Sequence, residues 1–169
     1  MRSTAIDRRL TMRVLQIWRR LARGPMLPRR SQVDPRLFGA DWPNCLLLDV
    51  DPVPEHSRIA YVGDKLRDSS WPPFERQCLA ECVSGTLLHL TTSKLSIVLE
   101  NAAPVSFGGS ALHGETSILY RAILLPLAEH GMHIDGIIGA VSYREVSLAN
   151  GVESLPLDAA VPGFVADDA

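Results

Sequence analysis

The residues with the clearest chemical potential lie close together, in the turn between the last two predicted strands and at the start of the last strand. His130, His133 and Asp135 supply two imidazoles and a carboxylate, which are ordinary metal ligands, and His113 is a conceivable fourth group. Alternation along a strand would place His133 and Asp135 on the same face. A metal ion held there would support metal-assisted hydrolysis. The simpler interpretation is structural, with a histidine in a turn and exposed polar residues on a strand.

The cysteines offer a second possible site. Cys78 and Cys82 are four residues apart and would share one face of a helix, a spacing that can support metal or redox chemistry. No second cysteine pair accompanies them, so packing is the preferred interpretation. With Cys45 they do not form a disulfide framework in a chain that shows no secretory leader, and this predicts reduced thiols in the cytoplasm.

Motifs for phosphate binding and for nucleophilic catalysis are missing from the sequence. Gly108 and Gly109 have neither the phosphate-loop lysine nor the dinucleotide glycine pattern around them, and they predict a bulge or a bend in a strand. No serine nucleophile elbow occurs, and no cysteine stands in a recognisable motif with a base. We therefore do not expect an enzyme.

An amphipathic helix is expected at the N-terminus. Apolar residues recur at three- and four-residue steps, and Gly24 and Pro25 end the pattern. The stripe consists of Leu10, Val14, Ile17, Trp18 and Leu21. It must be buried against the rest of the domain or against a second copy, and we predict that it forms the interaction surface.

The rest of the chain predicts an α+β domain. Prolines at 28, 35 and 43 indicate an extended connector over residues 26–44, followed by a strand hairpin at 45–50 and 59–62. Helical spacing after Pro72 and Pro73 predicts a helix containing Phe74, Cys78, Leu79, Cys82 and Val83. A second helix is expected over 86–100, although 95–99 would also suit a strand. Three strands then follow at 105–112, 117–127 and 132–143, and they form a meander.

Length and charge bound the remaining possibilities. A chain of 169 residues with 46% hydrophobic and 21% charged residues suits one folded domain, and no apolar run is long enough to span a membrane. Ten of the 17 basic residues precede Leu37, where only Asp7 and Asp34 oppose them. Such a basic segment is a solvated helix face or a contact for an anionic partner. Nucleic acid is not expected, because aromatic residues do not alternate with the arginines.

Particular segments, in this order of elements, resemble the PAS fold, and more closely a bacterial family of short standalone PAS proteins once catalogued as a domain of unknown function. The resemblance covers most of residues 10–145 and is carried by Trp18, LPRRSQVDP at 27–35, LLLDV at 46–50, YVG at 61–63 and ILLPLAEHGMHIDGIIGA at 123–140. It implies a PAS-like five-stranded antiparallel sheet with helices on one face, next to the N-terminal amphipathic helix. It also implies a signalling context, often with a histidine kinase as partner.

The resemblance implies a ligand cavity between helices and sheet. The cavity candidates are Trp71, Phe74, Leu87, His89 and Leu90. Some PAS sensors hold haem iron with a helix histidine, as His89 would be, but one residue is a weak signal and haem is not expected. The sequence requires no cofactor.

These observations predict a basic helix over 1–25, a PAS-like domain over 26–146 and a flexible acidic tail over 147–169. We expect a cytoplasmic sensory or regulatory module that acts through protein association, as a homodimer or on a signalling protein such as a histidine kinase. The alternative is a small metal-dependent hydrolase that uses His130, His133 and Asp135.

Overall fold

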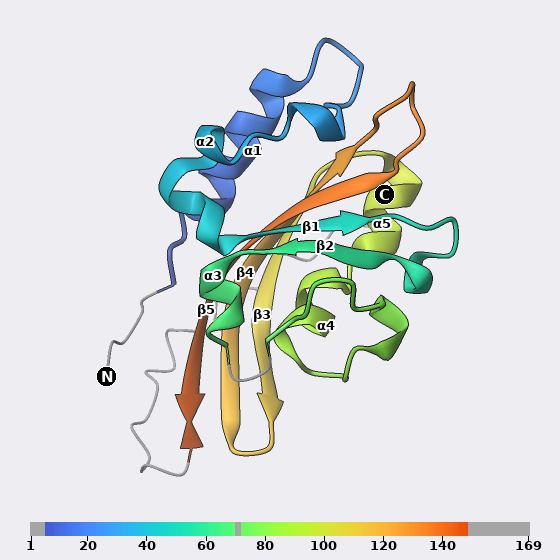
Figure 1. Ribbon diagram of the computed structural model, residues 1–169. Helices are drawn as coiled ribbons and strands as arrows, with labels where there is room; N and C mark the ends of the chain where they lie inside the picture. The colour runs from blue at the N-terminus through green and yellow to red at the C-terminus, as the bar shows by residue number, and fades with distance from the viewer. Residues whose placement is uncertain (1–5, 70–71, 149–169) are drawn as a thin grey trace, which may run out of the picture.

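The computed structural model of the protein describes residues 6–69 and 72–148 (Figure 1). The helices and strands are α1 (Leu10–Leu21), α2 (Pro35–Phe38), β1 (Cys45–Asp49), β2 (Arg58–Val62), α3 (Asp64–Arg67), α4 (Leu87–Thr92), α5 (Leu95–Asn101), β3 (Val105–His113), β4 (Thr116–Leu127) and β5 (Gly136–Ser147). In these two stretches of chain, every helix is too short or too polar to cross a membrane.

One antiparallel sheet with the strand order β2-β1-β5-β4-β3 organises the molecule. β1 and β2 form the predicted hairpin, and β3, β4 and β5 form the predicted meander. The two parts join where β1 pairs with β5, with Leu47 opposite Ile138. The helices between β2 and β3 and this strand order are PAS-like, and the predicted α+β class is confirmed.

The two faces of the sheet are covered by different helices, because alternate side chains of each strand point to opposite faces. Leu66 of α3, Leu88 of α4 and Val98 of α5 join the apolar core on one face. Leu10 of α1 and Phe38 of α2 join a second core on the other face. The central helices thus lie together as predicted, and α1 covers the sheet of its own domain (Figure 1).

The connector over residues 26–44 is not extended, contrary to the prediction. It contains 3₁₀ turns at Arg30–Gln32 and Gly39–Asn44 on either side of α2. Asp34 caps α2 by accepting a hydrogen bond from the Arg36 backbone N–H, and Pro35 occupies the first turn, where its missing N–H costs nothing. The prolines prevent a long element but allow these short ones.

The helix predicted around residues 74–83 is wrong. Only a 3₁₀ turn, Leu79–Glu81, forms there, so Cys78 and Cys82 do not share a helix face. The Arg76 backbone N–H donates to the Ile59 carbonyl, and the Ile59 N–H donates to the Gln77 carbonyl. The segment therefore extends along the outer edge of β2, whose backbone groups need partners.

The predicted helix over 86–100 is divided into α4 and α5. Hydroxyls of Thr91, Thr92 and Ser93 donate to carbonyls of the same turn of α4, a local bonding that competes with helix continuation. Lys94 then precedes α5, which ends at Ala102 in the left-handed conformation. The strand alternative for 95–99 is excluded.

The last strand begins at Gly136, four residues later than predicted, so His133 and Asp135 lie in a loop. This strand continues to Ser147. The predicted tail lies outside the described residues from 149 onward.

Candidate functional site

The predicted metal ligands lie in the loop between β4 and β5, where their roles are structural or solvent-facing. The Asp135 carboxylate accepts the Glu129 backbone N–H at 3.1 and 3.3 Å, and the Asp135 N–H donates to the Leu127 carbonyl at 3.1 Å. His130 and His133 are exposed. Among the described residues, no three His, Cys, Asp or Glu side chains lie close enough to hold a metal ion. Strand alternation does not apply to these positions, because the loop precedes β5.

The predicted cavity residues are dispersed. Leu87 is buried in the core and Leu90 packs against it. His89 is half-buried, and its Nδ1 accepts the Gly85 backbone N–H at 3.1 Å, at the start of its own helix. Phe74 is 65% exposed, which contradicts its assignment to a cavity wall. Trp71 lies outside the described residues.

Apolar side chains occupy the layer between α4, α5 and the sheet. Leu46, Leu48, Leu95, Val98 and Leu124 are all buried there. The burial of these side chains contributes to the stability of the fold.

Two segments that carry the resemblance meet at a surface depression of about 260 Å³. Its lining residues are Met26, Leu27, Arg29, Ala128, Glu129, His130 and Gly131. The Ala128 N–H donates to the Pro28 carbonyl at 2.9 Å, which joins the two walls.

Glu129 supplies the carboxylate that lines this depression, and Ser31 forms hydrogen bonds with it. The Ser31 backbone N–H and hydroxyl donate to its carboxylate at 2.9 and 2.8 Å. These bonds lower the pKa of Glu129, with smaller contributions from the charges of His130 and Arg29. A carboxylate so held is a poor proton acceptor and serves to fix the loop.

A second depression, of about 280 Å³, lies where the β4–β5 loop meets the end of β1 and α5. Its lining residues are Val50, Asp51, Pro52, Leu99, Ala102, Met132, His133 and Ile134. His133 and Asp51 are its titratable groups, too few for a nucleophile with a positioned base.

The residues predicted for interaction instead attach α1 to the sheet. Leu10 and Val14 are 1% and 0% exposed, so they are not available to a partner, and the prediction is wrong for these two. Ile17 and Trp18 pack partly buried against the same core, and the Trp18 Nε1–H donates to the Pro126 carbonyl at 2.9 Å. Leu21 is half-buried at the end of the helix.

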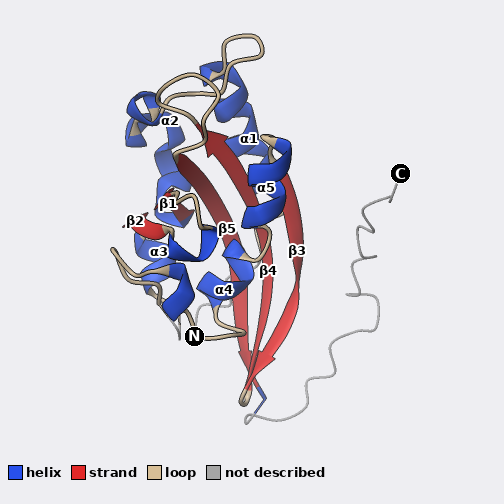
Figure 2. Ribbon diagram, turned by 90° about the vertical axis from the view of Figure 1, so that its right-hand side faces the viewer, coloured by secondary structure: helices blue, strands red, loops and turns tan. Residues whose placement is uncertain are grey.

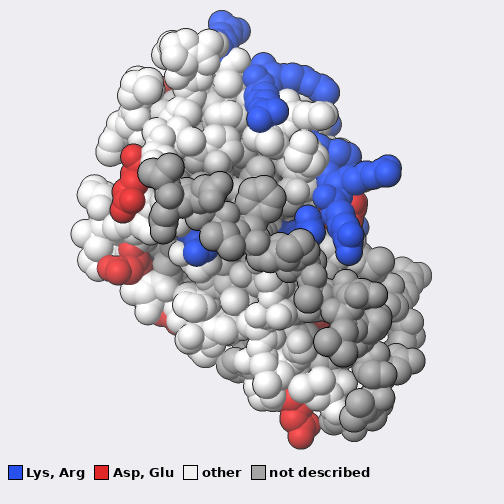
Figure 3. Space-filling view, turned by 180° about the vertical axis from the view of Figure 1, so that it is seen from behind, with Lys and Arg blue, Asp and Glu red and all other residues white. Residues whose placement is uncertain are grey.

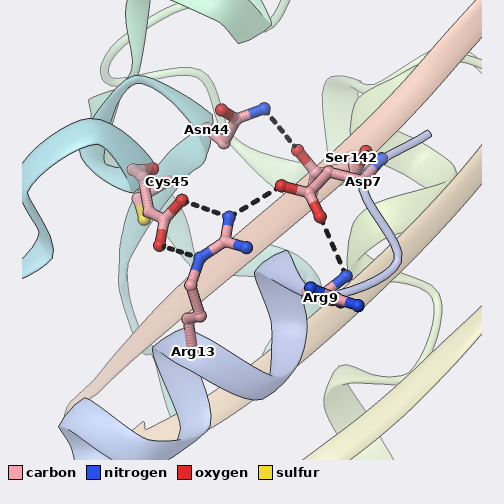
Figure 4. A network of polar contacts seen from close by, with 8 residues as sticks. Asp7, Arg9, Arg13, Asn44, Cys45 and Ser142 are labelled. Atoms are coloured by element: carbon pink, nitrogen blue, oxygen red, sulfur yellow. Dashed lines mark hydrogen bonds and ion pairs between the residues drawn. The ribbon is translucent and has the colours of Figure 1, made fainter. Parts of the chain in front are cut away.

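A polar clamp fixes the N-terminal end of α1 (Figure 4). Arg13 donates to both carboxylate oxygens of Asp41, at 2.8 and 2.6 Å, and to Asp7 at 2.7 Å. The Asp7 backbone N–H donates to the Ser142 hydroxyl on β5 at 2.7 Å. The Arg13 bond lowers the pKa of Asp7, and the two carboxylates raise the pKa of Arg13. No local sequence pattern predicts this clamp, since Arg13 and Asp41 are 28 positions apart.

The arginines of the first 36 residues differ in whether they have a counter-ion. Arg30 and Arg36 form ion pairs with Asp49 and Asp34. The exposed arginines of and beside α1 form none with the residues that the structure describes; we call them the arginine face, and they are Arg8, Arg9, Arg19, Arg20 and Arg23. Figure 3 shows basic side chains gathered along one side of the molecule, with most acidic ones away from them.

Comparison with known proteins adds little to this geometry. No protein-family model and no curated protein matches the sequence. A solved structure, the crystal structure of the Rhodobacter sphaeroides LOV protein, is similar with 10% identity and a TM-score of 0.33, over 88% of this chain and 72% of that one. The fold assignment therefore rests on strand order and connectivity.

Proposed function

We propose that the chain is a regulatory module of PAS-like fold that acts by binding another protein, and that the arginine face of α1 contacts an acidic surface of that partner. One observation carries the proposal. The apolar stripe of α1 is used within the domain, whereas the exposed side of α1 and of its flanking residues carries five arginines that no described carboxylate neutralises. Arginine suits this role because its planar guanidinium forms paired hydrogen bonds with carboxylates.

The way in which α1 packs on the sheet favours a protein partner over nucleic acid. The helix lies flat on the sheet, with Leu10 and Val14 buried, and does not project as a recognition helix must to enter a major groove. Trp18, the aromatic residue of the helix, is hydrogen-bonded to Pro126 and cannot stack on bases. Met12, 53% exposed between the arginines, supplies an apolar contact instead.

No observation favours the metal-dependent hydrolase. The Asp135 carboxylate caps its own loop, and His130 and His133 lie in that loop without a third ligand nearby among the described residues.

The test compares charge reversal with charge retention on three exposed arginines. The variants are Arg19→Glu, Arg20→Glu and Arg23→Glu together, against a control with lysine at the same positions. A protein captured by the wild-type chain from its source cells would be purified, and its affinity for each form measured by calorimetry. We expect the glutamate variant to bind at least tenfold more weakly and the lysine variant to keep most of the affinity.

Two results would overturn the proposal: equal affinity of all three forms, or capture of no protein at all. Tighter binding of duplex DNA than of any protein, with a steep salt dependence, would assign the face to nucleic acid.

A further inference from the structure

The strand β3 forms one margin of the sheet, and its outer edge is open. All of β3 pairs with β4 on its inner side, from Val105 opposite Leu124 to His113 opposite Thr116. No backbone hydrogen bond leaves its other side within the described part of the chain. Figure 2 shows β3 at this free margin. A nine-residue edge with unpaired N–H and C=O groups is a template for another strand.

The opposite margin of the sheet is treated differently. The outer edge of β2 is covered by the segment 76–79, through the Arg58–Cys78 bridge and the backbone bonds of Ile59. Among the residues that the structure describes, the fold therefore covers the β2 edge with its own chain and leaves the β3 edge uncovered.

β3 lacks the charged residues and prolines that normally prevent an edge strand from pairing with another chain. From Val105 to Leu112 there is no charged residue and no proline. Gly108, Gly109 and Ser110 are exposed in the middle of the strand, so no large side chain obstructs an incoming backbone. Leu112 is 64% exposed near its end.

We infer that β3 pairs antiparallel with β3 of a second copy, about a two-fold axis through Gly109, so that two sheets join into one. In this register Phe107 lies opposite Ala111 of the other copy and Leu112 lies opposite Ser106, so each of these two large apolar side chains meets a small one, while Val105 lies opposite His113. Because the strand is uncharged, the symmetry brings no like charges together, as a charged edge would.

The arginine face lies on α1 and the proposed dimer edge on β3, so the two proposals fail independently. An edge-to-edge contact of this kind is small, and we expect a dimer that dissociates on dilution.

The first test introduces a charge on the axis. Gly109→Lys would place two lysines opposite each other, whereas Gly109→Thr adds an uncharged β-branched residue. A Cβ at Gly109 would meet the Tyr120 side chain at 3.7 Å or more, an ordinary contact, so both variants should fold. By sedimentation velocity over a concentration series, we expect the wild type and the threonine variant to dimerise and the lysine variant to associate at least tenfold more weakly. Circular dichroism checks that each variant is folded.

The second test determines the register in which the two β3 strands pair. In a Cys82→Ala background, which removes the half-buried thiol, Gly109→Cys should form an intermolecular disulfide under mild oxidation, because residue 109 meets its own copy. Leu112→Cys should not, since it faces Ser106 of the other copy.

Several outcomes would overturn the inference. These are a wild type that stays monomeric at about 100 µM, a dimer unchanged by Gly109→Lys, or equal crosslinking of the two cysteine variants. Slow hydrogen exchange of the outward β3 amides in a monomer would show another segment on the edge and would overturn it as well.

Discussion

At the scale of single residues, Arg13 is the polar side chain that links α1 to two other segments of the chain. It joins α1 to Asp41 in the connector and to Asp7 in the preceding segment, which is itself bound to Ser142 on β5. Three separate parts of the chain thus meet at one guanidinium. Asp41 is mostly covered, with a side chain 14% exposed, so the loss of its partner leaves a carboxylate poorly solvated.

We expect Arg13→Ala to destabilise the fold by about 1–2 kcal/mol, because charge-assisted bonds to a partly buried carboxylate are lost. Urea unfolding followed by circular dichroism measures the change. Arg36→Ala is the matched control, since among the described residues Arg36 pairs with Asp34 alone, two residues away, and its side chain is exposed. The expectation is wrong if both variants have the midpoint of the wild type.

The ion pair of Asp7 leads to a second prediction, on how the stability of the fold depends on pH. Its folded-state pKa is lowered, first by the Arg13 bond, so its ionised form stabilises the fold above the unfolded pKa near 4. That contribution disappears as the pH falls through the folded pKa. Asp7→Asn should therefore be less stable than the wild type at pH 7, by less than about 1 kcal/mol, and this difference should shrink as the pH falls below about 4. Thermal melts over this range test it, with exposed Glu55→Gln as control; a gap that persists at low pH would contradict it.

At the scale of elements, α1 belongs to the domain and is not an appendage. Its contacts with the sheet bury Leu10 and Val14 and engage Trp18, so the helix is part of the second core. Experiments that truncate its apolar stripe would weaken the fold as well as any association.

We expect Trp18→Ala to cost about 3 kcal/mol, through lost packing and an unpaired Pro126 carbonyl. Trp18→Phe keeps most of the ring but loses the indole N–H, and should cost about 1 kcal/mol. Chemical denaturation separates the two variants. If neither changed the midpoint, α1 would not be held on the sheet as described.

At the scale of the whole molecule, the two cores share one sheet and should unfold together. Ile123 and Leu124 are neighbours on β4 and point into different cores. Loss of either core would leave the other face of the same strands without support.

The test is a pair of truncations on opposite faces, Leu10→Ala and Leu88→Ala, each expected to cost about 2–5 kcal/mol. Transitions followed by tryptophan fluorescence and by circular dichroism should coincide in both variants. Trp18 and Trp42 lie on the α1 side, so separate melting of that layer would appear first in the fluorescence. Two distinct midpoints in Leu10→Ala would show independent layers.

The candidate site was less predictable than the fold. The spacing of His130, His133 and Asp135 suggested ligands, but Asp135 accepts a backbone N–H within its own loop. The polar clamp had no local pattern, since Arg13, Asp41 and Ser142 are distant in sequence. The open edge of β3 had no local signal either, because an uncharged run such as residues 105–112 is typical of a strand that is paired on both sides.

The sequence by itself determined the elements whose pattern is local: the extent and the buried side of α1, the β1–β2 hairpin and the three-strand meander. Period and turn residues act over a few positions, so the chain carries that information directly. The tertiary structure alone decided that α1 covers its own sheet, that residues 76–79 extend along β2 instead of coiling, and that β3 keeps a free outer edge in the described part of the chain. Those outcomes depend on which distant backbone and side-chain groups become neighbours, and no local pattern contains them.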